Sequence, residues 1–225
     1  MQIVSLVPSV TETLCAWGVT PIACTRFCER PDLPHVGGTK DPDVARIVAL
    51  EPDLVVLDAE ENRREDHDRL LAEGVNLHVL HVRSLHDVTT GVAALADRIG
   101  VAWSMPRLPD PVETRARAFI PIWRRPWMAL GSPTYGSAVL AHLGVVNVFD
   151  DDGPYPTIDL ADAAARGPDV VLAPSEPYPF TTRQLPELES VAATVFLDGK
   201  DLFWWGARTP EALARLGDTL RVLAA

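Results

Sequence analysis

The chain repeats a spacing of acidic residues in its two halves. Residues 43–60 read DVARIVALEPDLVVLDAE, residues 159–176 read DLADAAARGPDVVLAPSE, and the two segments align without a gap. In each copy an aspartate is followed ten residues later by a second aspartate, and a glutamate follows seven residues after that. Similar halves usually fold into similar lobes, with a site between them. We therefore expect two related lobes and a ligand cleft between them.

Apolar strands and helices alternate through both halves. In the first half we expect strands at 3–7, 21–25, 53–57 and 77–82, and helices at 9–18, 43–50 and 60–73. In the second half we expect strands at 127–131, 146–149, 169–173 and 194–197, and helices at 133–143, 159–166, 181–190 and 210–224. Such alternation predicts an α/β fold: two similar lobes with mainly parallel sheets.

The segment between the halves reads as a helical linker. Apolar residues at helical spacing predict a helix over 85–99, prolines interrupt 101–111, and a short helix is expected at 112–119. The predicted domains are an N-terminal α/β lobe at 1–84, a helical linker at 85–119 and a C-terminal α/β lobe at 120–225.

The charge and hydropathy of the chain exclude several kinds of partner. The 225 residues carry a net charge of −11 and a pI near 4.9, whereas nucleic acids require a basic surface. No apolar run has the length of a membrane span, so no transmembrane segment is predicted. The sequence as written shows no export signal, which predicts a cytoplasmic protein; with a leader removed, it would be periplasmic or cell-surface. A monomer is expected.

Catalytic and metal-binding patterns are absent from the sequence. It contains no dinucleotide-binding glycine pattern, no phosphate loop and no nucleophile elbow. Cys15, Cys24 and Cys28 are too few for a disulfide framework, and no second pair completes a zinc site, so free thiols are expected. His78 and His81 point to opposite faces of a strand. We expect no enzyme, no metal site and no built-in cofactor.

Polar and aromatic residues cluster in the segments that follow the predicted strands. Ligands of open parallel sheets bind at that edge, and helix N-termini there favour anionic groups. Each residue has an ordinary alternative role as a cap or a core side chain, but aromatic loops also suit a flat, partly apolar ligand. The candidate ligand contacts are Pro8, Ser9, Arg26, Phe27, Gly38, Thr134, Tyr135, Tyr178, Phe180, Trp204 and Trp205.

Matched acids end the two copies of the repeat. Glu60 and Glu176 are predicted to begin helices, where a carboxylate is favourable. Alternatively, matched acids on two lobes are docking points for a pseudo-symmetric partner, and Glu61 lies in the same segment.

Six segments in order resemble the helical-backbone periplasmic binding proteins. They are IVSLVPSVTETL, TRFCERP, VGGTKDPDVARIVALEPDLVVLDAEENRRED, RRPWMALGSPTYGSAVLAHLGVVNVF, PDVVLAPSEPYPF and LDGKDLFWWGART. The sequence is most similar to the cobalamin-binding branch of the iron-siderophore, haem and cobalamin receptors of ABC importers. The resemblance implies two α/β lobes bridged by a long helix, ligand held in a shallow cleft, and one acid per lobe that pairs with permease arginines. Glu60 or Glu61, and Glu176, fall where those acids are expected.

Two hypotheses follow for function. The first is a non-enzymatic solute-binding protein that holds a corrinoid or related metal chelate, such as haem or a siderophore complex, for an ABC permease. The alternative is a cytosolic enzyme, chaperone or sensor for a corrinoid or tetrapyrrole on the same scaffold.

Overall fold

The computed structural model describes residues 1–221, which form two compact units. The first unit comprises Met1–Val82, His86–Met105 and Trp205–Ala207. The second comprises Arg83–Leu85, Pro106–Trp204 and the chain from Arg208 onwards. The helix predicted within the linker therefore packs almost wholly in the first unit, and the rest of the linker segment is divided between the two.

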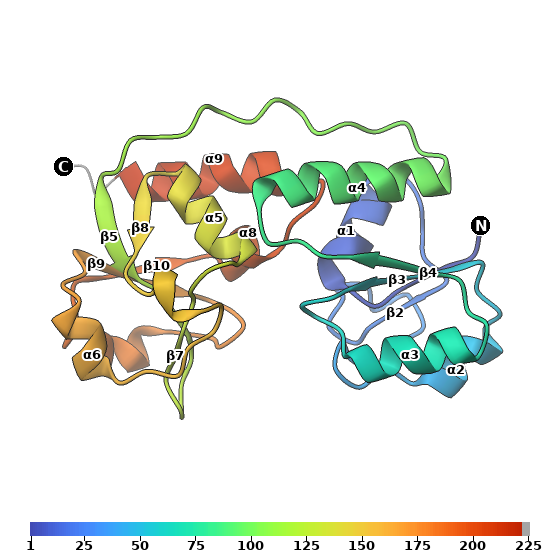
Figure 1. Cartoon of the computed structure of the whole chain (residues 1–225), viewed down its shortest axis with the longest axis horizontal. Coiled ribbons are helices and arrows are strands. Elements are labelled where there is room, and N and C mark those ends of the chain that lie inside the picture. The colour runs from blue at the N-terminus through green and yellow to red at the C-terminus, as the bar shows by residue number, and fades with distance from the viewer. Residues whose placement is uncertain (222–225) are drawn as a thin grey trace. The chain divides into compact units, whose positions relative to one another are not determined.

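The first unit is built on a four-stranded parallel sheet. Its strands are β1 (Ile3–Ser5), β2 (Ala23–Cys24), β3 (Leu54–Asp58) and β4 (Leu77–Leu80), in the order β2-β1-β3-β4. Figure 1 shows α2 (Val44–Ala49) and α3 (Arg64–Ala72) on one side of this sheet, with α1 (Pro8–Ala16) and α4 (Leu85–Ile99) on the other. On the side of α2 and α3, buried apolar side chains form one cluster that includes Val4, Leu6, Ile47, Val55, Leu57 and Leu70.

The second unit repeats the strand order of the first. β5 (Ala116–Phe119), β8 (Val145–Asn147), β9 (Val170–Pro174) and β10 (Thr194–Leu197) form a parallel sheet in the order β10-β9-β5-β8. Its helices are α5 (Tyr135–His142), α6 (Leu160–Ala165), α7 (Leu185–Leu188), α8 (Gly199–Phe203) and α9 (Thr209–Leu220), with 3-10 turns at Asp150–Asp152 and Thr182–Gln184. The predicted α/β fold with two similar parallel sheets is confirmed.

The sequence repeat has the same structural role in both units. Asp43 and Asp159 directly precede α2 and α6. The Asp53 carboxylate accepts a hydrogen bond from the backbone N–H of Gln2 at 2.5 Å, and Asp169 accepts one from Arg117 at 2.7 Å. Each second aspartate therefore ties the entry of a central strand, β3 or β9, to the neighbouring strand β1 or β5.

The start of the second sheet differs from the prediction. The helix expected at 112–119 is wrong, because Ala116–Phe119 is strand β5, between β8 and β9. The strand expected at 127–131 is instead part of an antiparallel hairpin, β6 (Pro121–Trp123) with β7 (Met128–Ala129). Alanine and arginine favour helices locally, but pairing with two neighbouring strands overrides that preference.

Three predicted helix starts are wrong. Helix α1 begins at Pro8 rather than after a Ser9 cap, and α5 is capped by Thr134, whose hydroxyl accepts a hydrogen bond from the N–H of Ser137. Proline fits the first helical position because its missing N–H is not needed there. The closing helix starts at Thr209, with Arg208 in the cap position; residues 222–224 of the predicted helix lie outside the described part of the chain.

The acids at the ends of the repeat do not begin helices. Helix α3 starts at Arg64, because the Asp58 carboxylate first binds the N–H groups of Glu60 and Glu61 in a turn. Glu176 lies before Pro177 in the segment that follows β9. Their helix-start explanation is therefore wrong, and the docking hypothesis remains for both.

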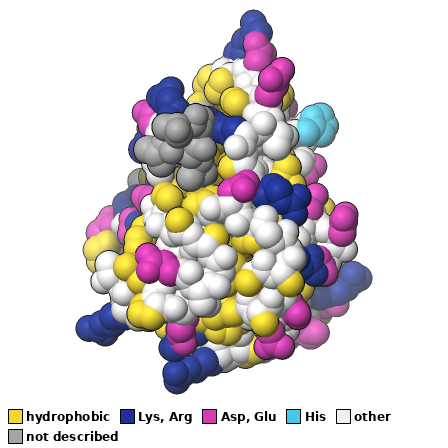
Figure 2. Space-filling view, turned by 90° about the vertical axis from the view of Figure 1, so that its left-hand side faces the viewer, with side chains coloured by type: hydrophobic (Ala, Val, Ile, Leu, Met, Phe, Trp, Pro, Cys, Tyr) yellow, Lys and Arg dark blue, Asp and Glu magenta, His cyan; other side chains and the backbone are white. Residues whose placement is uncertain are grey.

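The described residues contain no helix long and apolar enough to cross a membrane. Figure 2 views the second unit from its side at the left of Figure 1. On that face acidic, basic and apolar side chains are interspersed, unlike the continuous basic surface that nucleic acids require.

Candidate functional site

Each segment that follows a strand of the second parallel sheet carries an aromatic residue. Because β5, β8, β9 and β10 are parallel, the segments that follow them leave from one edge of the sheet. Those segments contain Trp123, Tyr155, Tyr178 and Trp204 in turn. Trp123 is 44% exposed and Tyr155 43%, while Tyr178 and Trp204 are half-buried. Accessible aromatic rings are therefore concentrated where ligands of parallel sheets bind.

Two of these rings belong to a continuous aromatic cluster of Trp123, Trp127, Tyr178 and Phe180. Trp123 meets Tyr178 edge-on with ring centroids 5.8 Å apart, and Tyr178 lies 4.7 Å from Phe180. Trp127 stacks on Phe180 at 5.9 Å with an interplanar angle of 7°. The buried rings hold the exposed ones in place, which gives a ligand a preorganised surface.

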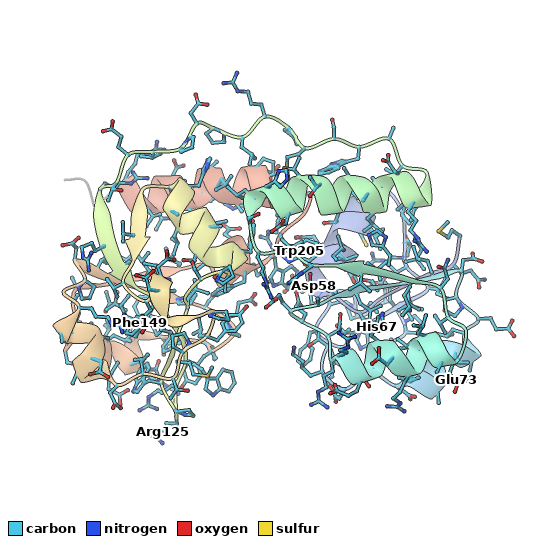
Figure 3. The ribbon with its side chains drawn as sticks, in the orientation of Figure 1. Asp58, His67, Glu73, Arg125, Phe149 and Trp205 are labelled. Carbon is cyan, nitrogen blue, oxygen red and sulfur yellow. The ribbon has the colours of Figure 1, made fainter. Side chains whose placement is uncertain are left out.

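An ion pair fixes the hairpin that carries Trp123 and Trp127. The Arg124 guanidinium donates two hydrogen bonds of 2.8 Å to the Glu187 carboxylate, and its centre lies 6.0 Å from the Trp127 ring centroid. Arg124 holds the pKa of Glu187 below its usual range. The adjacent Arg125 stands at the hairpin tip (Figure 3). The pair therefore joins the hairpin to α7.

Trp204 ends α8 beside two cations and one acid. The Lys200 ammonium lies 5.3 Å from its ring centroid and the Arg208 guanidinium 5.6 Å, both within cation–π range. Burial raises the pKa of Glu176, and the nearby Trp204 indole opposes that rise. Gly199 permits this packing, since a Cβ there would lie 2.5 Å from Cγ of Glu176.

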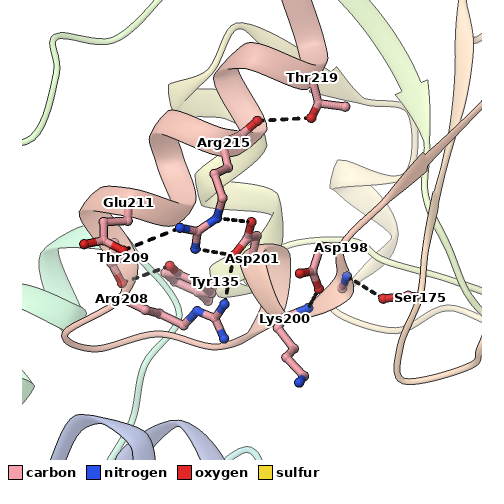
Figure 4. Close-up of polar contacts among 11 residues, drawn as sticks. Tyr135, Ser175, Asp198, Lys200, Asp201, Arg208, Thr209, Glu211, Arg215 and Thr219 are labelled. Carbon is pink, nitrogen blue, oxygen red and sulfur yellow. Dashed lines mark hydrogen bonds and ion pairs between the residues drawn. The ribbon is translucent and has the colours of Figure 1, made fainter. Parts of the chain in front are cut away.

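A buried carboxylate anchors α8 to α9. Asp201 accepts hydrogen bonds from Arg208 at 2.9 Å and from Arg215 at 2.7 Å (Figure 4). Burial alone would raise the pKa of Asp201, but the two arginines outweigh it and lower that pKa. The Tyr135 hydroxyl, beside this network, hydrogen-bonds Thr209 at 3.1 Å, and burial raises its pKa to about 12.

The carboxyl edge of the first sheet presents a cation and an aromatic ring after β2. Arg26 pairs with Asp41 at 2.9 Å and lies 4.9 Å from the ring centroid of Phe27, which is 53% exposed. Gly38 packs against Arg26, since a Cβ at position 38 would lie 2.8 Å from the guanidinium. The predicted contacts Arg26, Phe27 and Gly38 are therefore adjacent in the structure.

The segment after β3 is held by buried polar groups. Burial raises the pKa of Asp58. The hydrogen bonds that its carboxylate accepts from the N–H groups of Glu60, Val82 and Glu61 lower this pKa, but the effect of burial is larger. The Asn62 side chain accepts a hydrogen bond of 2.8 Å from the N–H of Asp58, and it donates hydrogen bonds to the carbonyls of Leu6 and Thr39. Asp58 stands at the end of β3 (Figure 3). This loop is therefore rigidly attached to its neighbours.

Glu60, in the loop that follows β3, contacts the side chains of His81 and Lys40. Its side chain lies 3.0 Å from His81 Nε2, and its carbonyl accepts a hydrogen bond of 2.8 Å from Lys40. A pocket of about 280 Å³ lies beside the same loop, lined by Leu57, Asp58, Ala59, Asn62, Arg63, Arg64, His67 and Val79.

The predicted ligand contacts include both accessible and buried side chains. Arg26 and Phe27 are exposed, and Tyr178 and Trp204 half-buried, so these four side chains are accessible. The remaining ones are buried: Pro8, Ser9, Gly38, Thr134, Tyr135, Phe180 and Trp205. Trp205 is 3% exposed and belongs to the first unit.

Trp123 and Tyr155 were not predicted as ligand contacts. Trp123 follows a strand that the sequence presents as a helix, so its loop was not recognised. Tyr155 lies between Pro154 and Pro156 in a segment predicted as a loop, and an aromatic residue between two prolines there was a usable signal. Within residues 1–221 no three histidine, cysteine or acidic side chains are placed to hold a metal ion.

Comparison with known proteins supports the resemblance found in the sequence. Residues 3–100 match the family model described as Periplasmic binding protein. The vitamin B12-binding protein of Salmonella choleraesuis (strain SC-B67) is 23% identical over 198 residues, covering 76% of this chain and 71% of that protein. The predicted resemblance to the periplasmic binding proteins is confirmed. A second relative, the vitamin B12-binding protein of Pectobacterium carotovorum subsp. carotovorum (strain PC1), is 22% identical over 241 residues, covering 94% of this chain and 84% of that protein.

Solved periplasmic binding proteins share the fold. The periplasmic vitamin B12 binding protein of Vibrio cholerae has a TM-score of 0.77 at 18% identity, covering 99% of this chain and 97% of that one. A periplasmic haem-binding protein from Roseiflexus sp. RS-1, in its apo form, has a TM-score of 0.78 at 20% identity, covering 100% and 99%. At these identities the likeness concerns the fold.

Proposed function

We propose that this chain is a non-enzymatic solute-binding protein for a corrinoid or a related metal chelate, and that it serves an ABC importer in the periplasm. The observation that carries the proposal is the set of four aromatic residues in the segments that follow the parallel strands of the second sheet: Trp123, Tyr155, Tyr178 and Trp204. Flat chelates have large apolar faces that pack on such rings. Relatives named for vitamin B12 and for haem support the same ligand class.

The accessible aromatic surface supplies part of the binding free energy. A tryptophan and a tyrosine together bury about 300–500 Å² when each passes from fully exposed to fully covered. Trp123 is 44% exposed and Tyr155 43%, so a ligand that covers both rings buries roughly 130–220 Å² of them. At about 25 cal/mol per Å² this corresponds to roughly 3–6 kcal/mol before the cost of association, and the half-buried Tyr178 and Trp204 add to it.

The accessible cations favour a ligand with peripheral polar groups. Arg26 beside Phe27, and Lys200 beside Trp204, place a positive charge next to an aromatic ring on each unit. Amides and carboxylates at the rim of a chelate accept hydrogen bonds from such groups. We propose Arg26, Phe27, Tyr178 and Trp204 as direct contacts, and the buried predicted residues as their support.

The acids Glu60, Glu61 and Glu176 are proposed as docking residues for permease arginines. The Asp58 turn and Asn62 fix the loop that carries the first two. Glu176 is half-buried and lies near Trp204, so on its unit docking would involve a carboxylate close to the proposed ligand surface.

Titration of the folded protein tests this function. Cyanocobalamin, haem and ferric siderophores are added separately while intrinsic tryptophan fluorescence is recorded, and calorimetry supplies stoichiometry. We expect saturable quenching by cyanocobalamin with one site per chain. Saturation by haem or a siderophore alone would change the ligand within the class, and no saturation by any of them would refute the proposal.

Replacing Trp123 with alanine is expected to weaken chelate binding about tenfold or more. Truncating an aromatic anchor at an interface typically costs about 1–2 kcal/mol or more. Phe196→Ala is the matched control, because Phe196 is 37% exposed but lies within β10 of the parallel sheet rather than in a segment that follows one of its strands. Equal affinities of the Trp123 and Phe196 variants would argue against the aromatic edge as the binding surface.

A further inference from the structure

The pocket beside the loop after β3 has no part in the proposed function. It has a volume of about 280 Å³, and its lining residues are Leu57, Asp58, Ala59, Asn62, Arg63, Arg64, His67 and Val79. None of the proposed ligand contacts or docking acids is among them. Pockets for drug-sized ligands measure about 300–1,000 Å³, so this one suits a small molecule.

The pocket lies between the first sheet and the beginning of α3. Leu57 of β3 and Val79 of β4 are directly paired across the two parallel strands, so their side chains share one face of the sheet. His67 stands on α3, on the side towards that sheet (Figure 3). Side chains of the strands and of the helix therefore line the same space.

The sheet side of the pocket is apolar and partly open to solvent. Leu57 is 1% exposed, whereas Val79 beside it is 46% exposed. Ala59 continues this apolar wall beyond the end of β3. A ligand whose apolar body covers Val79 removes that surface from water, which favours binding.

The helix side of the pocket carries two guanidinium groups that a ligand can reach. Among residues 1–221 the Arg63 side chain has no hydrogen-bond or ion-pair partner. Arg64 Nε lies 3.9 Å from Asp68 Oδ2, and these side chains are 89% and 57% exposed. Exposed ion pairs of this kind are weak, so Arg64 can turn towards a ligand.

The acids at the pocket are held by other partners. Asp58 lines the pocket, and its carboxylate accepts three hydrogen bonds from backbone N–H groups. Burial also raises the pKa of Asp58, which disfavours its charged form. Asp68 Oδ1 lies 2.8 Å from Nδ1 of His67. An anion can therefore approach Arg63 and Arg64 without breaking a strong ion pair.

We propose that this pocket binds a small organic carboxylate with an apolar body. The carboxylate pairs with the guanidinium groups of Arg63 and Arg64, whose planar sets of N–H donors match its two oxygens. The apolar body packs on Leu57, Ala59 and Val79. A neutral molecule of the same shape lacks the ion pairs, and an inorganic anion lacks the apolar contact.

Titration of the folded, methyl-labelled chain tests the site. Benzoate, benzamide and inorganic phosphate are added separately while the methyl NMR signals of Leu57, Ala59 and Val79 are followed. We expect saturable shifts with benzoate, half-saturated at about 1 mM or below. Benzamide and phosphate should not saturate these signals in the same range. The titration contains no chelate, so its result is independent of the proposed function.

Replacement of the arginines tests the ion pairs. Arg63→Gln combined with Arg64→Gln should raise the dissociation constant for benzoate about tenfold or more, because its charge-assisted hydrogen bonds are lost. Arg69→Gln is the matched control, because the Arg69 side chain is on the same helix and 65% exposed but does not line the pocket. This control should bind benzoate as wild type does. Circular dichroism checks that each variant is folded.

Four results would overturn the proposal. One is the absence of saturable shifts with benzoate, and a second is equal binding of benzamide and benzoate. A third is an unchanged affinity for benzoate in the folded double arginine variant. The fourth is saturation by phosphate at the same concentrations, because the apolar wall would then contribute nothing.

Discussion

Asp201→Ala should destabilise the second unit by about 3 kcal/mol. The Asp201 side chain is 4% exposed and pairs with Arg208, whose side chain is 13% exposed, and with Arg215, which is half exposed. Removing one partner from a buried ion pair costs about 3–5 kcal/mol, because the remaining charge loses its counterion away from water. The lower end applies here, since Arg215 can turn towards solvent.

The experiment is chemical denaturation of the purified variants, followed by circular dichroism. Asp152→Ala is the matched control, because the Asp152–Arg166 pair is also between an aspartate and an arginine, but both side chains are about one-third exposed. Exposed pairs contribute about 1 kcal/mol at most. If the two variants lose equal stability, the Asp201 network is not a buried anchor.

The Asp201 contribution should also depend on pH. The two arginines lower the pKa of Asp201 in the folded chain despite its burial, so near pH 4 the unfolded chain binds more protons at this site. The stabilisation is therefore fully present above the ordinary carboxyl pKa and is lost as pH falls through the lower folded value. The stability difference between wild type and Asp201→Asn should shrink on acidification below about pH 4.

Asn62→Ala should cost the first unit about 3 kcal/mol. Asn62 is 7% exposed and satisfies the N–H of Asp58 and the carbonyls of Leu6 and Thr39. Alanine leaves three backbone groups without these partners, and each unsatisfied buried group costs about 1–3 kcal/mol. The low end is expected for the Thr39 carbonyl, which lies in a partly buried position.

Asn76→Ala provides the comparison for Asn62. Asn76 also donates to a backbone carbonyl, that of Asp53 at 3.1 Å, but it is exposed. Its loss should cost about 0.5 kcal/mol or less. Denaturation gives the stability difference, and hydrogen exchange should show faster exchange of the Asp58 amide in the Asn62 variant alone. Unchanged protection of that amide would contradict the tethering role.

The repeated motif in the sequence was enough to predict two related halves. The aspartates of the repeat act on nearby backbone: Asp53 and Asp169 each bind the N–H of a neighbouring strand. Such contacts require only the right residue at the entry of a buried apolar strand, so the repeat carries them in its spacing. The same holds for β3 and β9, whose five residues are all buried.

The start of the second sheet shows where prediction from local sequence fails. Ala116–Phe119 resembles a helix when taken alone, and it becomes a strand because β8 and β9 flank it. That error concealed Trp123, since the loop after an unrecognised strand is not seen as part of the binding edge. The ring contact between Trp123 and Tyr178 likewise joins residues 55 positions apart in the sequence.

The sequence by itself determined that the chain forms two related α/β halves, which family it resembles, and that its loops are rich in aromatic residues. Only the tertiary structure decided which of those rings are accessible, since Trp204 is half-buried whereas the adjacent Trp205 is buried. Strand periodicity and strand entry are local properties of the chain, whereas side-chain exposure depends on neighbours that folding brings from distant parts of the sequence.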